Sequence, residues 1–337
     1  MDAPVAEPRA VRWQRRVRTI PLMLGAAAAA LVLVPVALPA LAVADLGRGR
    51  ACLPSVRVYL FALRYALNDS AEILLAGPYW LMAGFGRRID GPRSIARHQQ
   101  LQWWSLRTLA RSGERLLGVR VEVDEASMAV LAPGPVVVLC RHVSIVDASL
   151  PALLYQRLGY HVRGVIMAEL LADPGFDLLY GRLGSVFVPR DDSAAARSAV
   201  AQLGRGLGPT TVAAIFPEGR LFAPDVLARA QSRLAAGGDP ARAERLARLR
   251  RVLPPRPGGV LALLDAAPDA DVVVLDHRGL DAPPRFADLA RAVPLRTPLR
   301  VTAWRIARAD VPDDDAGRVA WLDDVWLALD AGLAAPA

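Results

Sequence analysis

The stretch Val136-Val-Val-Leu-Cys-Arg-His142-Val-Ser144-Ile-Val-Asp147 decides the fold of this chain. It opens with five apolar, mostly β-branched residues, which is typical of a buried strand, and Pro133-Gly134-Pro135 supplies the turn before them. We therefore expect His142 at the carboxyl end of a buried strand. Asp147 follows three residues after Ser144, which is the spacing of a helix-capping box, so Asp147 should lie in the first turn of the next helix with Ser144 as its N-cap.

This placement brings a histidine and a carboxylate to the edge of the sheet at which open α/β proteins bind their ligands. His142 can act there as a general base, and Asp147 can orient its imidazole ring. The alternative is structural, with Asp147 capping a helix and His142 ending a strand. This stretch by itself leaves both interpretations open.

Other apolar segments predict further strands that alternate with helices, so the expected fold class is α/β. A helix is predicted over 94–117, and a long helical region over 223–251 with a break at Gly237-Gly238. Strands are predicted over 119–123, 161–167, 184–190, 212–216, 272–276 and 299–306.

A second strand that ends in a polar residue begins after Gly184 and reaches Arg190 through Pro189. A guanidinium at a strand end can bind a phosphate through two parallel hydrogen bonds. The alternative for Arg190 is an ordinary solvated surface arginine.

A third such strand, over 212–216, leads into Pro217, Glu218, Gly219 and Arg220. Glu218 can accept hydrogen bonds from a substrate, and Gly219 allows a ligand to approach the backbone closely. Arg220 adds a fixed positive charge. Pro-Glu-Gly taken alone also fits an ordinary turn.

The composition limits the classes of function. All 41 basic residues are arginine, against 33 acidic residues, which gives the 337-residue chain a net charge of +8. The absence of lysine excludes Schiff-base lysine chemistry and the P-loop lysine. The positive charge suits a phospholipid surface or a phosphorylated substrate. No nucleic-acid-binding signature is present, so we expect no nucleic-acid partner.

The two cysteines, Cys52 and Cys140, form neither a disulfide framework nor a zinc site. Cys140 lies inside the apolar strand, and we expect a small buried apolar side chain there and not a nucleophile.

The N-terminal part predicts membrane attachment. Residues 1–19 are rich in arginine and should lie in the cytoplasm, and residues 20–44 are uncharged and mostly apolar. As one helix, the second segment spans roughly 37 Å, enough to cross a bilayer. The alternative is a signal peptide, because Ala40-Leu-Ala42 resembles a cleavage site. The apolar segment is longer than in signal peptides, so we expect an uncleaved transmembrane helix.

Residues 45–93 form a second apolar segment that contains Arg64, Asp69 and Glu72. These charges oppose a simple membrane span, so we expect a membrane-associated or re-entrant helix pair broken at Gly77-Pro78. The alternative is a helix packed within the soluble domain. A second crossing or a re-entrant loop would keep the remaining domain on the cytoplasmic face of the cell membrane.

The three strands with polar ends, in this order, resemble the glycerophospholipid acyltransferase superfamily, specifically the 1-acylglycerol-3-phosphate acyltransferases. Its first block is His-x4-Asp, its second is Gly-x-x-Phe/Ile-Ile/Val-x-Arg and its third is Phe-Pro-Glu-Gly-Thr/Ser-Arg. The matching residues are His142 and Asp147 with Ser144 in its usual place, then Gly184, Phe187, Val188 and Arg190, then Phe216, Pro217, Glu218 and Gly219.

Two departures from the family pattern stand out. The Thr/Ser of the third block is missing, so Arg220 lies one place early, and the fourth block is represented by Val272–Asp276 without its proline. The segment Val252–Val260 and the late helix with Trp321 and Trp326 resemble the lysocardiolipin acyltransferase-like branch.

The resemblance implies one catalytic domain over 94–337 with a central, mostly parallel sheet flanked by helices. It implies transfer of a fatty acyl group from acyl-CoA or acyl carrier protein to a lysophospholipid, with 1-acyl-sn-glycerol 3-phosphate as the first choice. His142 and Asp147 would be catalytic, without cofactor or metal. Ser144, Gly184, Glu218 and Gly219 would hold the substrate, and Arg190 and Arg220 would bind its phosphate.

Three alternatives remain open at this stage. Another lysophospholipid such as lysocardiolipin could be the acceptor. A hydrolase could use the same His-Asp pair on water. A membrane-associated, non-catalytic lipid-binding protein could retain the fold after losing activity, which the altered third block permits.

Overall fold

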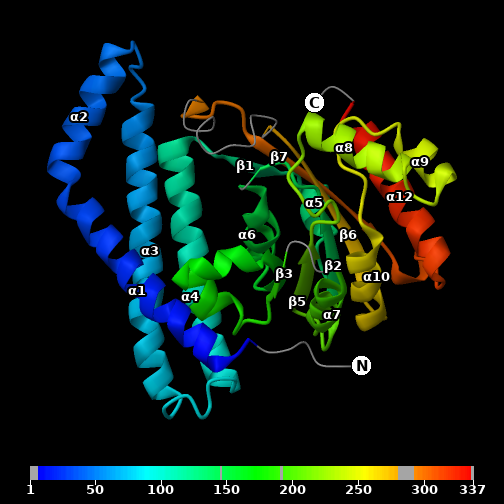
Figure 1. Ribbon diagram of the computed structural model, residues 1–337, viewed down its shortest axis with the longest axis horizontal. Helices are drawn as coiled ribbons and strands as arrows, with labels where there is room; N and C mark the ends of the chain where they lie inside the picture. The colour runs from blue at the N-terminus through cyan, green and yellow to red at the C-terminus, as the bar shows by residue number, and fades with distance from the viewer. Residues whose placement is uncertain (1–6, 145, 190–192, 280–291, 335–337) are drawn as a thin grey trace. The chain divides into compact units, whose positions relative to one another are not determined.

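The computed structural model of the protein describes residues 7–144, 146–189, 193–279 and 292–334. A seven-stranded sheet runs through it in the order β1-β7-β6-β2-β5-β3-β4 (Figure 1). The registered pairs are parallel except for β6 with β7, which confirms the predicted α/β fold with a mostly parallel sheet. The strands are β1 Val121–Val123, β2 Val136–Cys140, β3 His161–Met167, β4 Val186–Val188, β5 Thr211–Ile215, β6 Asp271–Arg278 and β7 Leu299–Ile306.

Contacts divide the chain into two compact units. The first unit comprises residues 1–120, 166–195 and 287–298, and the second comprises 121–165, 196–286 and 299–337. The segment boundaries at 19/20, 44/45 and 93/94 are expected from the hydropathy of the sequence and not from contacts. They remain predictions.

The core of the second unit is built on β2. Every residue of this strand is buried, and β5 and β6 pair with it on either side, so that Val138 lies opposite Ala214 and Val273. A strand covered on both faces requires a continuous apolar run, which is what the sequence supplies. The carboxyl ends of β2, β5 and β6 therefore meet at one edge of the sheet.

Helices surround these strands in the second unit, and α10 packs against α12, where Trp326 is fully buried. The predicted break at Gly237-Gly238 is confirmed, because α8 ends before it and α9 begins after it. The helices are α5 Glu125–Ala129, α6 Leu150–Arg157, α7 Ser193–Gly204, α8 Pro224–Ala235, α9 Pro240–Leu246, α10 Pro257–Ala266 and α12 Asp315–Gly332.

The predicted single transmembrane helix over 20–44 is wrong as drawn. The chain forms two helices, α1 Arg9–Val32 and α2 Val34–Gly47, bent by 67° at Leu33. Pro35 explains the break, because its ring clashes with the carbonyl of the preceding turn and it has no N–H to continue the hydrogen-bond ladder. Among the described residues no single helix is long and apolar enough to cross a membrane, whereas this bent pair together meets the length and composition that a crossing needs.

The predicted break at Gly77-Pro78 is also wrong, since α3 runs without interruption from Pro54 to Met82. Helix α4, Pro92–Ser112, packs beside it and continues into a π-helical turn at Gly113–Leu117. Asn68 of α3 donates a 2.7 Å hydrogen bond to Thr108 of α4. Asn68, Asp69, Ser70 and Glu72 of α3 are buried within protein, as the packed-helix alternative expects, and Arg64 is half-buried.

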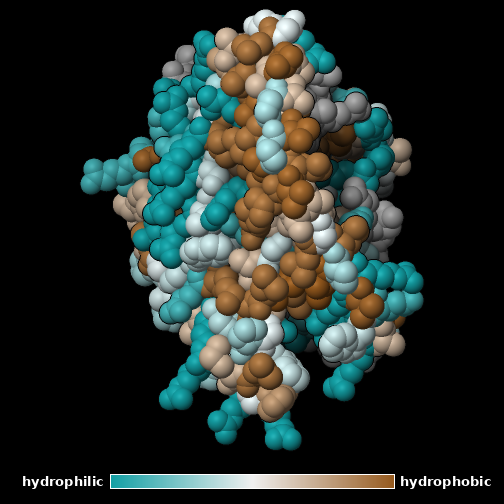
Figure 2. Space-filling view, turned by 90° about the vertical axis from the view of Figure 1, so that its left-hand side faces the viewer, coloured by the Kyte–Doolittle hydropathy of each residue, from teal (hydrophilic) through white to brown (hydrophobic). Residues whose placement is uncertain are grey.

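An apolar band covers one face of the first unit, over the helices at the left of Figure 1 (Figure 2). Large apolar side chains are exposed at the bend between α1 and α2 and again toward the end of α3. They include Leu31, Val32, Leu33, Val36, Leu74, Leu81, Met82 and Phe85. An exposed apolar surface of this extent marks a contact with a membrane or a partner.

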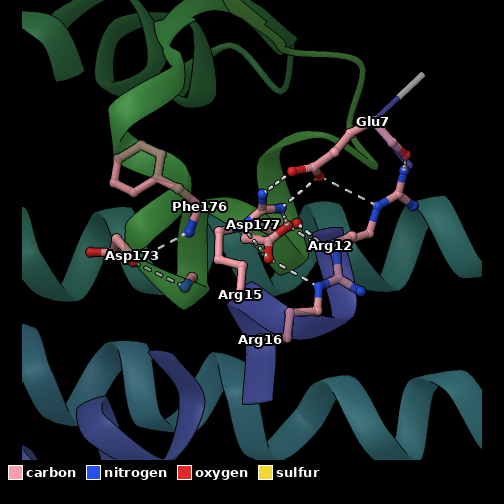
Figure 3. A network of polar contacts seen from close by, with 8 residues as sticks. Glu7, Arg12, Arg15, Arg16, Asp173, Phe176 and Asp177 are labelled. Carbon is pink, nitrogen blue, oxygen red and sulfur yellow. Dashed lines mark hydrogen bonds and ion pairs between the residues drawn. The ribbon is translucent and has the colours of Figure 1, made fainter. Parts of the chain in front are cut away.

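Two arginines fasten α1 within the first unit (Figure 3). Arg15 and Arg16 each bind the carboxylate of Asp177 at 3.0 Å, and Glu7 binds Arg15 from the other side. Burial raises the pKa of Asp177, but the hydrogen bonds from Arg16 and Arg15 outweigh it and lower the pKa below its usual range. The basic N-terminus therefore contributes to packing, besides any role in membrane topology.

Candidate active site

The centre of the site is a hydrogen bond between His142 and Asp147. Nδ1 of His142 lies 2.7 Å from Oδ1 of Asp147. Because Asp147 accepts at Nδ1, the other ring nitrogen, Nε2, is left without the proton and can act as a base. The side chain of His142 is 20% exposed, which is enough for a small reacting group to reach it. The ring packs on Phe216, with the two centroids 4.5 Å apart.

Asp147 is fully buried and accepts further hydrogen bonds from the backbone. Its Oδ2 accepts from the N–H groups of Val143 at 2.6 Å and Ser144 at 2.8 Å. Burial raises the pKa of Asp147, but the hydrogen bonds and charges of His142 and His277 outweigh it and hold the pKa at about 2. Asp147 is therefore charged at neutral pH and held in place from several sides.

The predicted capping role of Ser144 is wrong, because Ser144 does not cap the helix that follows. The short 3-10 helix Asp147–Ser149 begins after Val146, whose side chain forms no cap. Ser144 lies in the turn before it, and its hydroxyl accepts a 3.3 Å bond from the N–H of Val146. The Asp147 carboxylate folds back on this turn and shapes the loop around His142. The predicted contact of Ser144 with substrate remains a prediction.

A second histidine approaches Asp147 from another strand of the sheet. His277 is buried near the end of β6, and its Nε2 lies 3.3 Å from Oδ2 of Asp147. Arg141, also buried, donates a 2.7 Å bond to the backbone carbonyl of His277 and lies 3.5 Å from Asp276. The end of β6 is thereby fixed against the end of β2, with Asp147 between two imidazoles.

Glu218 connects two loops behind His142. One carboxylate oxygen accepts from the N–H of His142 at 3.0 Å, and the other accepts from the N–H of Leu253 at 2.9 Å. The side chain is 2% exposed, and this burial raises the pKa of Glu218 to about 8. Both oxygens are thus engaged with the backbone. Glu218 thus links the loop of His142 to the loop of Leu253. Its predicted contact with substrate remains a prediction.

Gly219 and Arg220 follow in the same turn, which the N–H of Gly219 closes with a 3.0 Å bond to the carbonyl of Phe216. Gly219 has a φ of +64°, a conformation that favours glycine. The chain then returns to the histidine, because the N–H of Phe222 donates a 2.7 Å bond to the carbonyl of His142. The loops that follow β2 and β5 are therefore hydrogen-bonded to each other beside the ring of His142, and the end of β6 contacts Asp147 through His277.

Gly184, another predicted substrate residue, belongs to the first unit. Gly184 has a φ of +82° and forms the turn that precedes β4. Arg190 lies outside the described residues, so its predicted role in phosphate binding remains a prediction.

Cys140 is fully buried in β2, and this burial raises the pKa of its thiol well above the usual range. A thiol in this state is a poor nucleophile, in agreement with the apolar role expected of it.

This geometry, a histidine paired with a buried aspartate at the end of a central parallel strand, coincides with a family match. Residues 118–275 match the Acyltransferase family. The matched segment contains β1, β2, β5, His142, Asp147 and Glu218. No curated protein matches the chain.

Among solved structures, the chain is similar to the crystal structure of the 1-acyl-sn-glycerophosphate (LPA) acyltransferase PlsC from Thermotoga maritima. The two share 16% sequence identity with a TM-score of 0.51, over 84% of this chain and 99% of the other. At this identity the likeness shows the fold alone.

Proposed function

We propose that this protein is an acyltransferase that transfers a fatty acyl group from an acyl thioester, acyl-CoA or acyl carrier protein, to the free hydroxyl of a lysophospholipid. The first-choice acceptor is 1-acyl-sn-glycerol 3-phosphate, and the product is then phosphatidic acid. The observation that carries the proposal is the 2.7 Å hydrogen bond between His142 and Asp147 inside the matched family segment.

The chemistry needs one base and no covalent enzyme intermediate, because a thioester is already activated. Nε2 of His142 takes the proton of the acceptor hydroxyl as its oxygen attacks the thioester carbonyl carbon. The carbon–sulfur bond then breaks, and the departing thiolate takes the proton back from His142. Asp147 stabilises the imidazolium that forms between these steps.

Two arginines would supply the affinity for a phosphorylated acceptor. We assign phosphate binding to Arg190 and Arg220, because a guanidinium can donate two parallel hydrogen bonds to a phosphate. We assign Glu218 and Gly219 to the shape of the loop beside the acceptor. Loss of Arg190 should chiefly raise the KM for the phosphorylated acceptor.

The acceptor resides in a bilayer, and we propose that the apolar band of the first unit and the α1–α2 pair hold the protein at the cell membrane. The catalytic residues then act from the cytoplasmic face. The net charge of +8 favours a surface of anionic phospholipids.

The test is acyl transfer by purified protein in detergent or lipid, with labelled acyl-CoA and lysophosphatidic acid. We expect phosphatidic acid from the wild type and a loss of roughly 10²–10⁴-fold in His142→Ala, the cost of removing a general base. His161→Ala is the matched control, because His161 begins β3 away from the proposed base and should leave transfer unchanged.

Three other outcomes would replace the proposal. Release of free fatty acid without acceptor would indicate a hydrolase. Transfer to a different lysophospholipid, for example lysocardiolipin, would keep the mechanism and change the acceptor. If no donor and acceptor pair reacts and His142→Ala changes nothing, the protein is a non-catalytic lipid-binding protein.

A further inference from the structure

Three arginines of the second unit come together at the turn that carries Glu218. Arg220 belongs to the turn itself, Arg233 lies on α8, and Arg256 directly precedes α10. Partial burial and the positive charges of Arg220 and Arg233 lower the pKa of Arg256. Arg220 and Arg233 therefore each place a positive charge near that of Arg256.

Arg256 lies directly against Gly219. A Cβ built on Gly219 would be 3.3 Å from Cδ and 3.5 Å from Cζ of Arg256, so the side chain crosses the face of this glycine. The backbone N–H of Arg256 donates a 2.8 Å bond to the carbonyl of Pro217, which fixes the two loops together. Glu218, between these contacts, binds the N–H of His142.

This positive cluster has no counter-charge among the described residues. Within them, the side chains of Arg220, Arg233 and Arg256 form neither an ion pair nor a hydrogen bond. Other arginines of the same unit are paired with carboxylates. These pairs are Arg229 with Asp225, Arg242 with Asp323, Arg245 with Asp324, Arg305 with Asp271 and Arg318 with Asp265. Unpaired like charges held together by the fold are the electrostatic signature of an anion site.

We propose that Arg256, with Arg220 beside it, binds a phosphate group of the substrate over the Gly219 turn. The phosphate satisfies the guanidinium donors and removes the repulsion among the three arginines. The inference rests on the proposed function for the identity of the substrate. It also accounts for the altered third block, because Leu221 stands where the family pattern has arginine, and Arg256 supplies a guanidinium from another loop.

Two sources could deliver this phosphate, the head group of the acceptor and the phosphates of coenzyme A. Steady-state kinetics separate them. If the acceptor supplies it, Arg256→Ala raises the KM for lysophosphatidic acid by about 10–100-fold, leaves the KM for acyl-CoA unchanged, and leaves transfer to monoacylglycerol unaffected, because this acceptor has no phosphate. If coenzyme A supplies it, the KM for acyl-CoA rises instead.

Two further variants separate binding from folding and from net charge. Arg256→Lys keeps the charge and loses the two-pronged geometry, so we expect it to recover part of the lost affinity. Arg248→Ala removes the same charge from an exposed position in the same unit, and we expect it to leave both KM values unchanged. Circular dichroism and thermal unfolding of each variant confirm that the fold is retained.

A binding measurement distinguishes this inference from the proposed function. We would titrate His142→Ala, alone and combined with Arg256→Ala, with sn-glycerol 3-phosphate and with coenzyme A. Loss of binding in the double variant supports the phosphate site even if the wild type transfers no acyl group. Unchanged binding and unchanged KM values in an active enzyme overturn the phosphate site and leave the proposed function intact.

Discussion

The imidazoles of His142 and His277 both contact Asp147. No local sequence pattern predicts the contact of His277. Replacing His277 by phenylalanine keeps a ring in the buried space and removes its contact with Asp147. Oδ2 of Asp147 keeps its bonds from Val143 and Ser144, so the loss is one contact of about 0.5–1.5 kcal/mol, and we expect kcat to fall by roughly 2–13-fold, with KM unchanged. His161→Phe should leave kcat unchanged.

The same variant should alter the response to acid. The pKa of Asp147 is about 2, below its usual 3.8, so its stabilising contribution is present above pH 3.8 and is lost as the pH falls through 2. His277→Phe raises this pKa toward its usual value and reduces the contribution. Thermal unfolding at pH 7 and at about pH 2 measures the change. An unaltered kcat together with an unaltered unfolding profile would assign His277 to packing alone.

Glu218 should show the opposite dependence of stability on pH. Burial raises its pKa to about 8 from the ordinary 4.5, so between these values the folded state binds a proton that the unfolded state does not. Its contribution to stability is full below pH 4.5 and is lost as the pH rises through 8. Urea unfolding at several pH values should show this loss in the wild type. Glu218→Gln cannot titrate, and a wild-type curve parallel to that of the variant would refute the shift.

At the scale of elements, Asp177 fixes α1 within the first unit by accepting from Arg15 and Arg16. Asp177→Ala leaves two largely buried guanidinium groups without this partner, and we expect a loss of about 1–3 kcal/mol in the free energy of unfolding. Limited proteolysis should then cleave α1 sooner. Asp225→Ala is the matched control, because its pair with Arg229 is exposed and should contribute less than about 1 kcal/mol.

The elements that carry the site were predictable because their signals are local. The apolar run 136–140 and the polar residues after it indicated both the strand and the His142–Asp147 pair. The contact of His277 with Asp147 was not predictable, since it depends on the pairing of β6 with β2, more than a hundred residues apart. The same holds for Arg256, whose contact with Gly219 arises only when two distant loops meet.

The helix boundaries show how one residue type can have two outcomes. Pro35 interrupts the N-terminal apolar segment near its middle, and the helix breaks two residues before it. Pro78 lies within the last turns of α3, which continues to Met82. The lost hydrogen bond costs less where a helix is about to end and its last turn is packed or solvated. Pro21 in the middle of α1 and Pro39 in α2 also leave their helices unbroken, so the presence of a proline does not by itself predict a helix break.

At the scale of the whole molecule, the exposed apolar band of Figure 2 predicts binding to phospholipid. Val32 and Val36 are 75% and 67% exposed at the bend between α1 and α2. Replacing both by arginine should reduce the fraction of protein that floats with phospholipid vesicles, because each arginine costs up to about 3 kcal/mol in the apolar region. Val11→Arg lies on the same helix before the apolar segment and should have little effect. Equal flotation of all three proteins would remove this surface from membrane binding.

The two backbone hydrogen bonds of Glu218 have a consequence for redesign of the acceptor preference. One of them ends at Leu253, three residues before Arg256, so the stretch beyond Leu253 can be exchanged without losing this bond, provided that position 256 keeps the N–H that binds Pro217. A graft limited to 254–257 would present a different head-group contact to an unchanged base. A graft that extends back through Leu253 would release the loop and the base together, and new selectivity would come with lost turnover.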